Sequence, residues 1–415
     1  MGLIKTSLLN GIAVVVKMLT LLGINKVLAV YVGPSGYAAI GQFQNAVQMI
    51  TTLASGAINT GVTKYTAEYH YSEQKQRAVW RTAGTMAIIG SLLTGALLIA
   101  FSRPIAIWVF NTESLSSVFY WVAIALVFQV FNSLLLAILN GKKNIRKYVI
   151  ANISGSIFSL IIITILTFYG ELYGALVGLA IYQALAFWVT LFICFKEDWF
   201  KKDFLVGKLN KYIAVDLSKY MLMALTSAIC VPVSHMLIRN HLGSTLGWEA
   251  AGYWEAMWRL STAYLILVTS TLSIYYLPRL SELTNPEDVR REIILGYKII
   301  LPFAIFCGFL IYVFRDFIVS ILFSNDFYPI RDLFAWQMVG DTLKTASWIL
   351  GYLLAAKAMV KAFLLTEIFF SLFFYLLIYW GTDFIGLNFV SVAHAINYGV
   401  HLVVMFLIVK RLKII

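Results

Sequence analysis

The stretch SLLNGIAVVVKMLTLLGINKVLAVY at residues 7–31 is long and apolar enough to cross a bilayer as one helix. Lys17 lies near its middle, roughly 15 Å from either end of a straight helix, and no acidic residue lies within a helical turn of it. A lone ammonium at the bilayer centre costs roughly 3 kcal/mol or more. Such a charge is tolerated where it faces a polar cavity, and a cationic cavity favours an anionic cargo.

The composition of the whole chain is that of an all-α polytopic membrane protein. Of its 415 residues 60% are hydrophobic and only 13% are charged, and the mean hydropathy is +0.82. Soluble domains are roughly 25% charged. Transmembrane helices are predicted at twelve places, which are 7–31, 36–62, 83–102, 116–139, 149–169, 173–195, 218–239, 252–277, 297–314, 333–356, 362–381 and 387–409.

The Lys and Arg residues are distributed unequally between the two sides of these predicted spans. Of the 32, 24 fall on the side that holds both termini. The four on the opposite side are Arg103, Arg239, Arg315 and Arg331. The four within spans are Lys17, Lys26, Arg259 and Lys344. Because basic loops stay in the cytoplasm, both termini are predicted to be cytoplasmic, and the net charge of +12 is a topology signal rather than a sign of nucleic-acid binding. Anionic lipid of the inner leaflet would be attracted to the same face.

The chain divides into two halves of six predicted spans. Residues 1–195 form an N-terminal lobe, residues 196–217 a cytoplasmic linker and residues 218–415 a C-terminal lobe. The linker begins with KEDWFKKDF (196–204), in which lysines alternate with aromatic residues, as in a helix that lies at a membrane surface. An ordinary solvated linker fits this composition equally well.

Signatures of soluble enzymes are missing from the sequence. There is no P-loop, no GxSxG, no HExxH and no Cys/His spacing for a metal. The first apolar stretch is too long for a cleavable signal peptide. The three cysteines lie in predicted spans, and their odd number argues against a disulfide framework. We therefore expect a transporter without a catalytic site, a metal or a cofactor.

Lys17 and Lys26 share the first predicted span but not one face of it. Nine residues at about 100° each place them on opposite sides of an ideal helix. Either Gly23 loosens the helix between them, or only one of the two lysines lines a cavity. Lys26 lies closer to the outer end, where its side chain can also extend to the membrane surface.

Two pairs of opposite charges lie inside later spans. Glu255 and Arg259 are separated by four residues, and Asp341 and Lys344 by three, so that both pairs can form local ion pairs. One interpretation is that each pair is structural and neutralises itself. In the other, the acid releases the base when an anion arrives, or carries a coupling proton.

The second predicted span is polar along its outer half and basic at its inner end. Gln44 and Gln48 lie on one face of that helix and Lys64 follows at the end. The amides either hydrogen-bond to neighbouring helices or contact sugar hydroxyls in a wet cavity. Lys64 is a candidate for binding the anion.

Four segments carry a resemblance to a known family. They are VKMLTLLGINKVLAVYVGPSGYAAIG (16–41), GVTKYTAEYH (61–70), YLPRLSELT (276–284) and IRDLFAWQMVGDTLK (330–344). On these landmarks the chain resembles the Wzx-type lipid-linked oligosaccharide flippases, which include O-antigen translocases and enterobacterial common antigen flippases. These belong to the multidrug/oligosaccharidyl-lipid/polysaccharide exporter superfamily, and the similarity runs nearly end to end.

The resemblance implies twelve helices in two lobes around a central cationic cavity. It implies a bacterial inner-membrane protein that flips undecaprenyl-pyrophosphate-linked repeat units to the periplasmic leaflet, with a polysaccharide polymerase or chain-length protein as its partner. The family pattern carries over to Lys17, Lys26, Lys64, Asp341 and Lys344, whereas Arg259 is a candidate from the helix pattern alone.

Three other functions compete with this one. A cation-coupled multidrug exporter of the same superfamily would favour acidic residues in its first helix, where this chain has two lysines and no acid. A lipid II flippase handles similar cargo, but its usual members have fourteen helices. A membrane-embedded glycosyltransferase or ligase needs a catalytic carboxylate or a large outer loop, and the predicted outer loops are short.

The charge bias generates a prediction about topology. Single cysteines introduced at Lys208 and at Glu113 should react with a membrane-impermeant thiol reagent from opposite sides, with position 113 labelled in intact cells and position 208 only after permeabilisation. Labelling of position 208 from the periplasmic side would contradict the assigned orientation.

Overall fold

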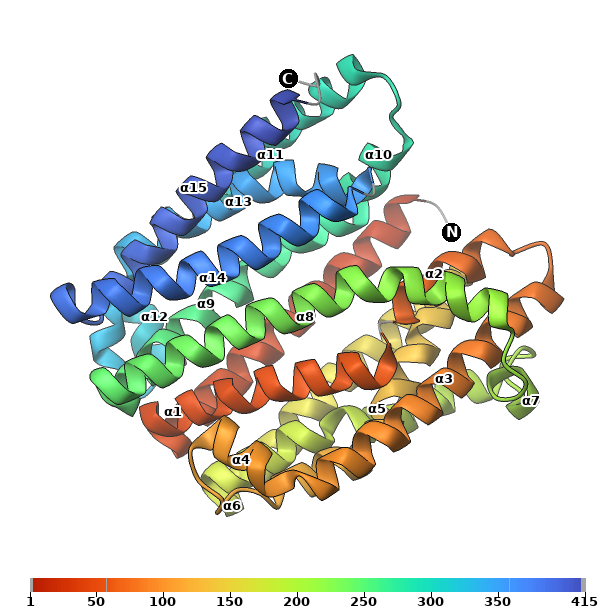
Figure 1. Cartoon of the computed structure of the whole chain (residues 1–415), viewed down its shortest axis with the longest axis horizontal. Coiled ribbons are helices and arrows are strands. Elements are labelled where there is room, and N and C mark those ends of the chain that lie inside the picture. Colours follow the sequence, from red (N-terminus) through yellow and green to blue (C-terminus); the bar gives the residue numbers. More distant parts are fainter. Residues whose placement is uncertain (1–2, 57, 358, 412–415) are drawn as a thin grey trace. The chain divides into compact units, whose positions relative to one another are not determined.

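The computed structural model describes residues 3–56, 58–357 and 359–411, and the described elements are helices joined by short turns. The chain forms two compact units (Figure 1). Unit 1 comprises Met1–Tyr31 and Ala39–Pro232, and unit 2 comprises Val32–Ala38 and Val233–Ile415. The short segment 32–38 of the first helix thus packs with the C-terminal half of the chain.

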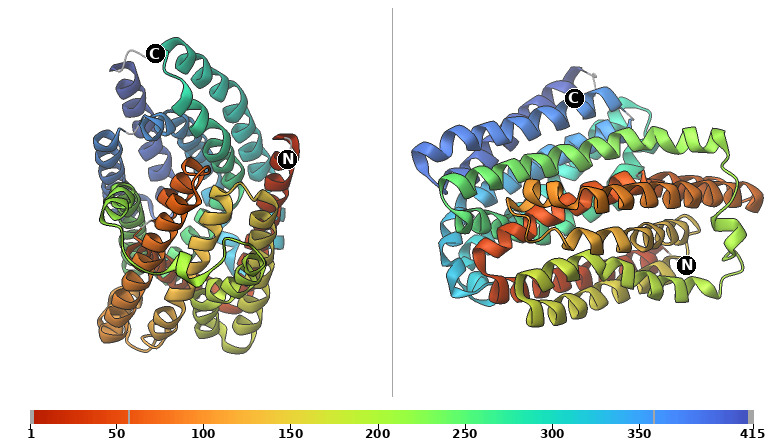
Figure 2. Two further views of the ribbon diagram at one scale, coloured as in Figure 1. Left: turned by 90° about the vertical axis from the view of Figure 1, so that its right-hand side faces the viewer. Right: turned by 60° about the horizontal axis from the view of Figure 1, so that its bottom comes forward.

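Unit 1 contains the first seven helices and the beginning of the eighth. They are α1 (Leu3–Ser55), α2 (Ile58–Glu68), α3 (Glu73–Ala100), α4 (Ser102–Phe110), α5 (Val118–Gly141), α6 (Ile145–Phe195), α7 (Lys202–Leu205) and α8 (Lys211–Thr245). Within this unit α3, α5 and α6 lie side by side as long helices (Figures 1 and 2).

Unit 2 contains the end of α8 and the rest of the chain. Its further elements are α9 (Trp248–Thr271), the π-helix η1 (Leu272–Tyr276), α10 (Leu277–Glu282), α11 (Pro286–Val313), α12 (Arg315–Leu322), the 3-10 helix η2 (Asn325–Leu333), α13 (Phe334–Ala356), α14 (Val360–Ile385) and α15 (Phe389–Arg411). In this unit α13 packs on α15 and α11.

Helix covers most of each of the twelve predicted spans in the described residues, but two pairs of spans share one long element. In α1 the chain turns back at Gly33, whose φ of 68° suits a residue without Cβ, and Pro34 follows. In α6 the turn lies at Glu171, with φ 46°. In Figure 1 the red first arm of α1 is followed by an orange arm that returns toward α2. Each of the two elements is therefore a helical hairpin.

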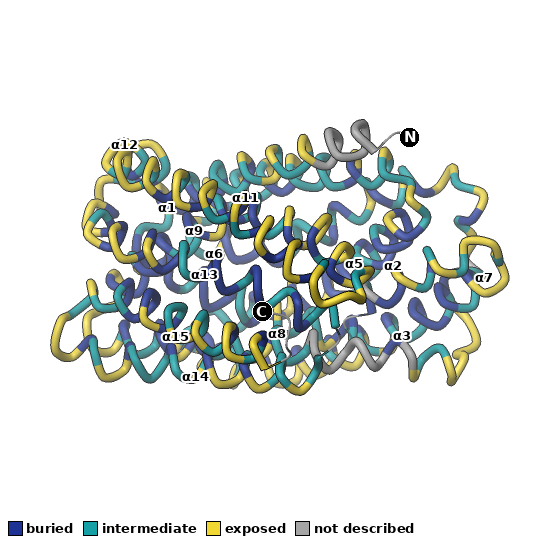
Figure 3. The backbone as a smooth tube through the Cα atoms, turned by 90° about the horizontal axis from the view of Figure 1, so that it is seen from above, coloured by how far each residue is buried: buried dark blue, intermediate teal, exposed yellow. Residues whose placement is uncertain are grey.

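The outer faces of these helices are apolar, as expected of a polytopic membrane protein. Eight described helices, including the two long ones, are apolar enough by length and composition to cross a membrane. Large side chains such as Leu93 at 63% and Phe309 at 61% stay exposed, and exposed positions (yellow) follow the outer turns of the helices in Figure 3. Such faces are stable in hydrocarbon and would aggregate in water.

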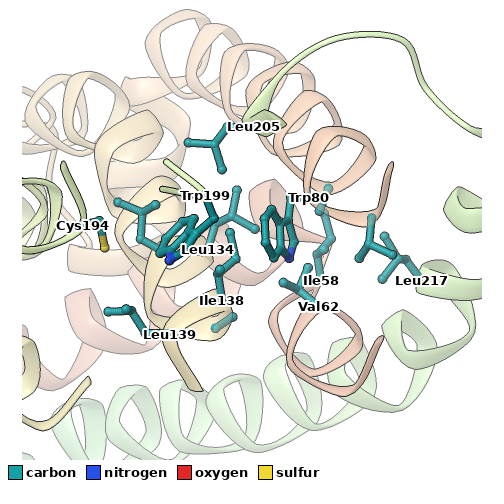
Figure 4. Close-up of a cluster of buried hydrophobic side chains, with 14 residues drawn as sticks. Ile58, Val62, Trp80, Leu134, Ile138, Leu139, Cys194, Trp199, Leu205 and Leu217 are labelled. Carbon is teal, nitrogen blue, oxygen red and sulfur yellow. The ribbon is translucent and has the colours of Figure 1, made fainter. Parts of the chain in front are cut away.

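The segment 196–210, the first part of the predicted linker 196–217, is anchored in a hydrophobic cluster of unit 1. Trp199 and Leu205 are 7% and 6% exposed and pack in one cluster with Trp80 (Figure 4). Only Lys202–Leu205 is helical within the segment. The predicted lobe boundary at 196–217 stays a prediction, as do the two-lobe arrangement and the central cavity.

Gly84 tests this anchoring. A Cβ at Gly84 would lie 1.8 Å from the carbonyl oxygen of Leu205, so Gly84→Ala should displace the linker and lower stability by about 1–3 kcal/mol. Gly351→Ala is the matched control, since no atom lies within 4 Å of that Cβ position. Thermal unfolding in detergent measures both, and equal unfolding temperatures for the two variants would contradict the close contact.

Candidate functional site

Unit 2 buries a group of charged, polar and aromatic side chains that lie on four helices. Arg239 comes from α8, and Glu255, Trp258, Arg259 and Tyr264 come from α9. Asp341, Lys344 and Trp348 lie on α13, and His394 and Tyr398 lie on α15. The helical spacing places Glu255, Trp258 and Arg259 on neighbouring positions of one face. The same holds for Asp341, Lys344 and Trp348.

Asp341 lies at the centre of a hydrogen-bond network. Its side chain is 0% exposed. The hydroxyl of Tyr264 donates to its Oδ2 at 2.8 Å, and the Nε2 of His394 lies 3.0 Å from its Oδ1. The Nε2 of Gln337 adds a longer contact of 3.4 Å to Oδ1. Since a buried carboxylate is stable only when its oxygens are hydrogen-bonded, these partners account for its burial.

Lys344 has a different environment, although it lies one helical turn from Asp341. It is 6% exposed, and its ammonium lies 4.3 Å from the ring centre of Trp258, 4.9 Å from that of Trp348 and 5.2 Å from that of Tyr398. Among the described residues the Lys344 Nζ has no salt bridge and no hydrogen-bond acceptor. The rings attract the cation but offer it no acceptor, so its N–H groups are available to an anion.

Of the two acid–base pairs whose spacing allows an ion pair, one forms it and the other does not among the described residues. Glu255 and Arg259 form the expected pair, with 2.7 Å between Oε1 and Nε. Asp341 does not pair with Lys344, because its two oxygens bind Tyr264 and His394 from other helices.

Glu255 is shared between two arginines. Arg239 Nε lies 3.0 Å from its Oε2, and the two side chains are 1% and 5% exposed. Arg239 had been predicted for an outer loop, but α8 continues to Thr245 and carries it into the core. Two guanidinium groups around one carboxylate leave one net positive charge buried there. Removing either partner of such a buried pair is strongly destabilising.

Trp258 connects the two charged groups. Its ring centre lies 4.3 Å from that of His235, 5.5 Å from that of His394 and 6.0 Å from that of Trp254, over which the guanidinium of Arg239 lies at 5.6 Å. The group formed by Arg239, Glu255, Trp258, Arg259, Asp341, Lys344 and His394 is named the basic cluster below. If its histidines are neutral, the cluster has a net charge of +1 from the three bases and two acids.

The first-helix candidates lie in unit 1. α1 stays helical through Gly23, so the helix is not loosened there, and Lys17 and Lys26 point to different faces. Lys17 is exposed and makes no ion pair with any residue in the described part of the chain, whereas Lys26 is half-buried beside the buried Asn25. Lys17 is thus the lysine of α1 that is more accessible to a ligand.

The other candidates of unit 1 are more peripheral. Gln44 is half-buried and Gln48 is exposed on the second arm of α1. Lys64 is exposed on α2, with its ammonium 5.3 Å from the ring centre of Tyr65. Among the described residues, no three His, Cys, Asp or Glu side chains are grouped so that they could hold a metal ion.

Several residues of the basic cluster were not candidates from sequence. His394 lies 53 positions from its partner Asp341, and no local spacing connects them. Trp258 could have been found from the sequence, because it lies three residues after Glu255, on the helix face that carries Glu255 and Arg259. Arg239 follows the apolar residues of its predicted span, and hydropathy therefore assigns it to an outer loop.

The sequence of this chain is similar to those of several known proteins. The family model described as polysaccharide biosynthesis protein matches residues 3–284. The lipid III flippase of Escherichia coli (strain K12) is 33% identical over 368 residues, which cover 89% of this chain and 88% of that protein. A probable lipid II flippase MurJ of Borreliella burgdorferi is 24% identical, with 86% of this chain and 74% of that one covered.

Solved structures of transporters share the fold. An inward-facing multidrug resistance MATE family transporter of the MOP superfamily superposes with a TM-score of 0.76 at 18% identity, covering 96% of this chain and 94% of that one. A MOP superfamily transporter from Pyrococcus furiosus, described as having a binding pocket of reverse polarity, gives 0.68 at 17% identity, with 97% and 95% covered. From the match over residues 3–284 and the 33% identity along nearly its whole length, the chain belongs to the polysaccharide biosynthesis protein family and is a relative of the lipid III flippases.

Proposed function

We propose that this protein is a flippase for undecaprenyl-pyrophosphate-linked oligosaccharide repeat units. It would move them from the cytoplasmic to the periplasmic leaflet of the bacterial inner membrane by alternating access. The 33% identical lipid III flippase supports a lipid-linked glycan as cargo. The observation that carries the proposal at the level of the site is Lys344, a buried ammonium surrounded by aromatic rings.

The charge of the basic cluster supports an anionic cargo. A pyrophosphate has about two negative charges and cannot cross the hydrocarbon core unaided. Lys344 offers N–H donors that no described carboxylate occupies, and the Arg239–Glu255–Arg259 group adds a net positive charge. A pump for organic cations needs the opposite polarity, so the multidrug exporter is the weaker candidate.

The remaining candidates receive subsidiary roles in this proposal. Lys17 and Lys26 of α1 and Lys64 of α2 would attract the pyrophosphate, and the amides of Gln44 and Gln48 would contact sugar hydroxyls. Arg259 and Glu255 would hold the charge of the basic cluster in place. The polyprenyl tail would stay in lipid, which removes the need to bury it in the protein.

Lys344 provides the direct test. A hydrogen bond to a charged group is worth about 1.5–3 kcal/mol, so Lys344→Gln should slow translocation of a pyrophosphate-linked oligosaccharide in proteoliposomes by about 10- to 100-fold. The exposed Lys361 on α14 gives the matched control, and Lys361→Gln should transport normally. Wild-type speed in the Lys344 variant would remove this lysine from the mechanism. Export of organic cations by the wild type, with no flipping of the glycolipid, would overturn the proposed function.

A double-mutant cycle tests the separate roles of Asp341 and Lys344. Because Asp341 contacts His394 and not Lys344, Asp341→Asn and His394→Gln should be non-additive in thermal stability by about 0.5–3 kcal/mol. The cycle of Asp341→Asn with Lys344→Gln should be closer to additive. A larger coupling between Asp341 and Lys344 than between Asp341 and His394 would contradict the arrangement.

A further inference from the structure

The segment 196–210 is fixed to α3 through its backbone. Arg81 Nε donates to the carbonyl oxygen of Asp203 at 2.7 Å. The hydroxyl of Thr85 donates to the carbonyl oxygen of Gly207 at 2.9 Å, and the N–H of Gly207 lies 3.0 Å from the same hydroxyl oxygen. The side chains of this segment are therefore held at defined positions against α3, which a loosely solvated linker would not provide.

This folding gathers cations around one aromatic ring. The guanidinium of Arg77 lies 4.0 Å from the ring centre of Phe204, and the ammonium of Lys201 lies 5.7 Å from it. Arg77 also pairs with Glu73 at 2.5 Å, but both of these side chains are solvent-accessible. Among the described residues Lys201 has no carboxylate partner, and the only hydrogen bond of the Arg81 guanidinium is that of its Nε. Several cationic N–H groups therefore remain available.

The surroundings of this ring combine bases with exposed aromatic side chains. Phe195 is 72% and Tyr212 is 84% exposed at the two ends of the segment. Figure 3 shows the turns around α7 mostly in yellow, the colour of exposed residues. Other exposed bases of unit 1 are Lys143 in the turn before α6, Arg146 on α6, Lys196 and Lys208 in the segment, and Lys211 on α8. Aromatic rings beside basic residues are the composition of surfaces that lie in the headgroup region of a membrane.

We propose that Arg77 and Lys201, which stack on Phe204, and Arg81, which is bonded to the carbonyl oxygen of Asp203, form a binding site for the phosphate of an anionic phospholipid. Phe195 and Tyr212 lie at the interface on either side of the segment. Stacking on Phe204 orders the two cations and leaves their N–H groups for phosphate oxygens, to which arginine can bind with two parallel hydrogen bonds. The site lies on the face that the charge bias predicts to be cytoplasmic, where anionic lipid is abundant.

This site differs from a general preference of basic loops for anionic lipid in one testable way. A general attraction depends on the number of charges, so any three exposed bases on the predicted cytoplasmic side contribute equally. Binding at the proposed site depends on the three particular bases Arg77, Arg81 and Lys201. The exposed Arg290, Arg291 and Lys298 of α11 offer a matched control on the same predicted side, because no aromatic ring contact with them is described.

The experiment compares two triple variants of the full chain. Arg77→Gln/Arg81→Gln/Lys201→Gln removes the site, and Arg290→Gln/Arg291→Gln/Lys298→Gln removes the same charge elsewhere. Each protein is extracted from bilayers of equal phosphatidylglycerol and phosphatidylcholine, and the retained lipids are counted by native mass spectrometry. The wild type and the control variant should retain phosphatidylglycerol at least tenfold over phosphatidylcholine, and the site variant should lose that preference.

Two outcomes would overturn the proposal. One is an equal loss in both triple variants, which would reduce the effect to diffuse charge, and the other is full retention in the site variant. The single variant Lys201→Gln is the control for misfolding, because among the described residues the Lys201 ammonium contacts the ring of Phe204 and no carboxylate. This variant should lose part of the preference for phosphatidylglycerol, and its unfolding temperature should equal that of the wild type. The result does not depend on whether the protein transports a glycan.

Discussion

The polar core of unit 2 depends on how the carboxylate of Asp341 is hydrogen-bonded. Tyr264 and His394 donate to its two oxygens from α9 and α15, so both oxygens are hydrogen-bonded without Lys344. Lys344, one turn further along α13, is left with the faces of Trp258, Trp348 and Tyr398. Burying a cation without an anion is unfavourable, and aromatic rings offset only part of that energy. We propose that a bound anionic ligand offsets the part of this burial free energy that the rings do not.

A second buried group has the same character. Glu255 lies between Arg239 and Arg259, so this group has a net positive charge. The group is buried, since the Arg239 and Glu255 side chains are 1% and 5% exposed. Trp258 lies between this group and Lys344, so the two positive centres belong to one packed region. A helix bundle built only for stability would favour apolar residues at these positions. The retained charges are therefore consistent with a site that handles anions.

The sequence predicted the helices well and the partners of the charged side chains poorly. Hydropathy predicted helix at all twelve places, because a span needs about 20 apolar residues whatever its neighbours are, and eight of the described helices are apolar enough to cross a membrane. Local spacing predicted the pair of Glu255 and Arg259, since both residues lie on one helix. The partner of Asp341 could not be predicted, because His394 belongs to another helix and is brought close only by packing. Arg239 was placed in an outer loop for the same reason, since tertiary contacts, and not local composition, bury it.

The most direct measurement is a structure of the protein with a polyprenyl-pyrophosphate-linked oligosaccharide bound. The account predicts that a pyrophosphate oxygen lies about 3 Å from the Nζ of Lys344, with Asp341 still hydrogen-bonded to Tyr264 and His394. A bound pyrophosphate that leaves Lys344 enclosed by its three rings, with no phosphate oxygen in hydrogen-bond distance, would contradict it.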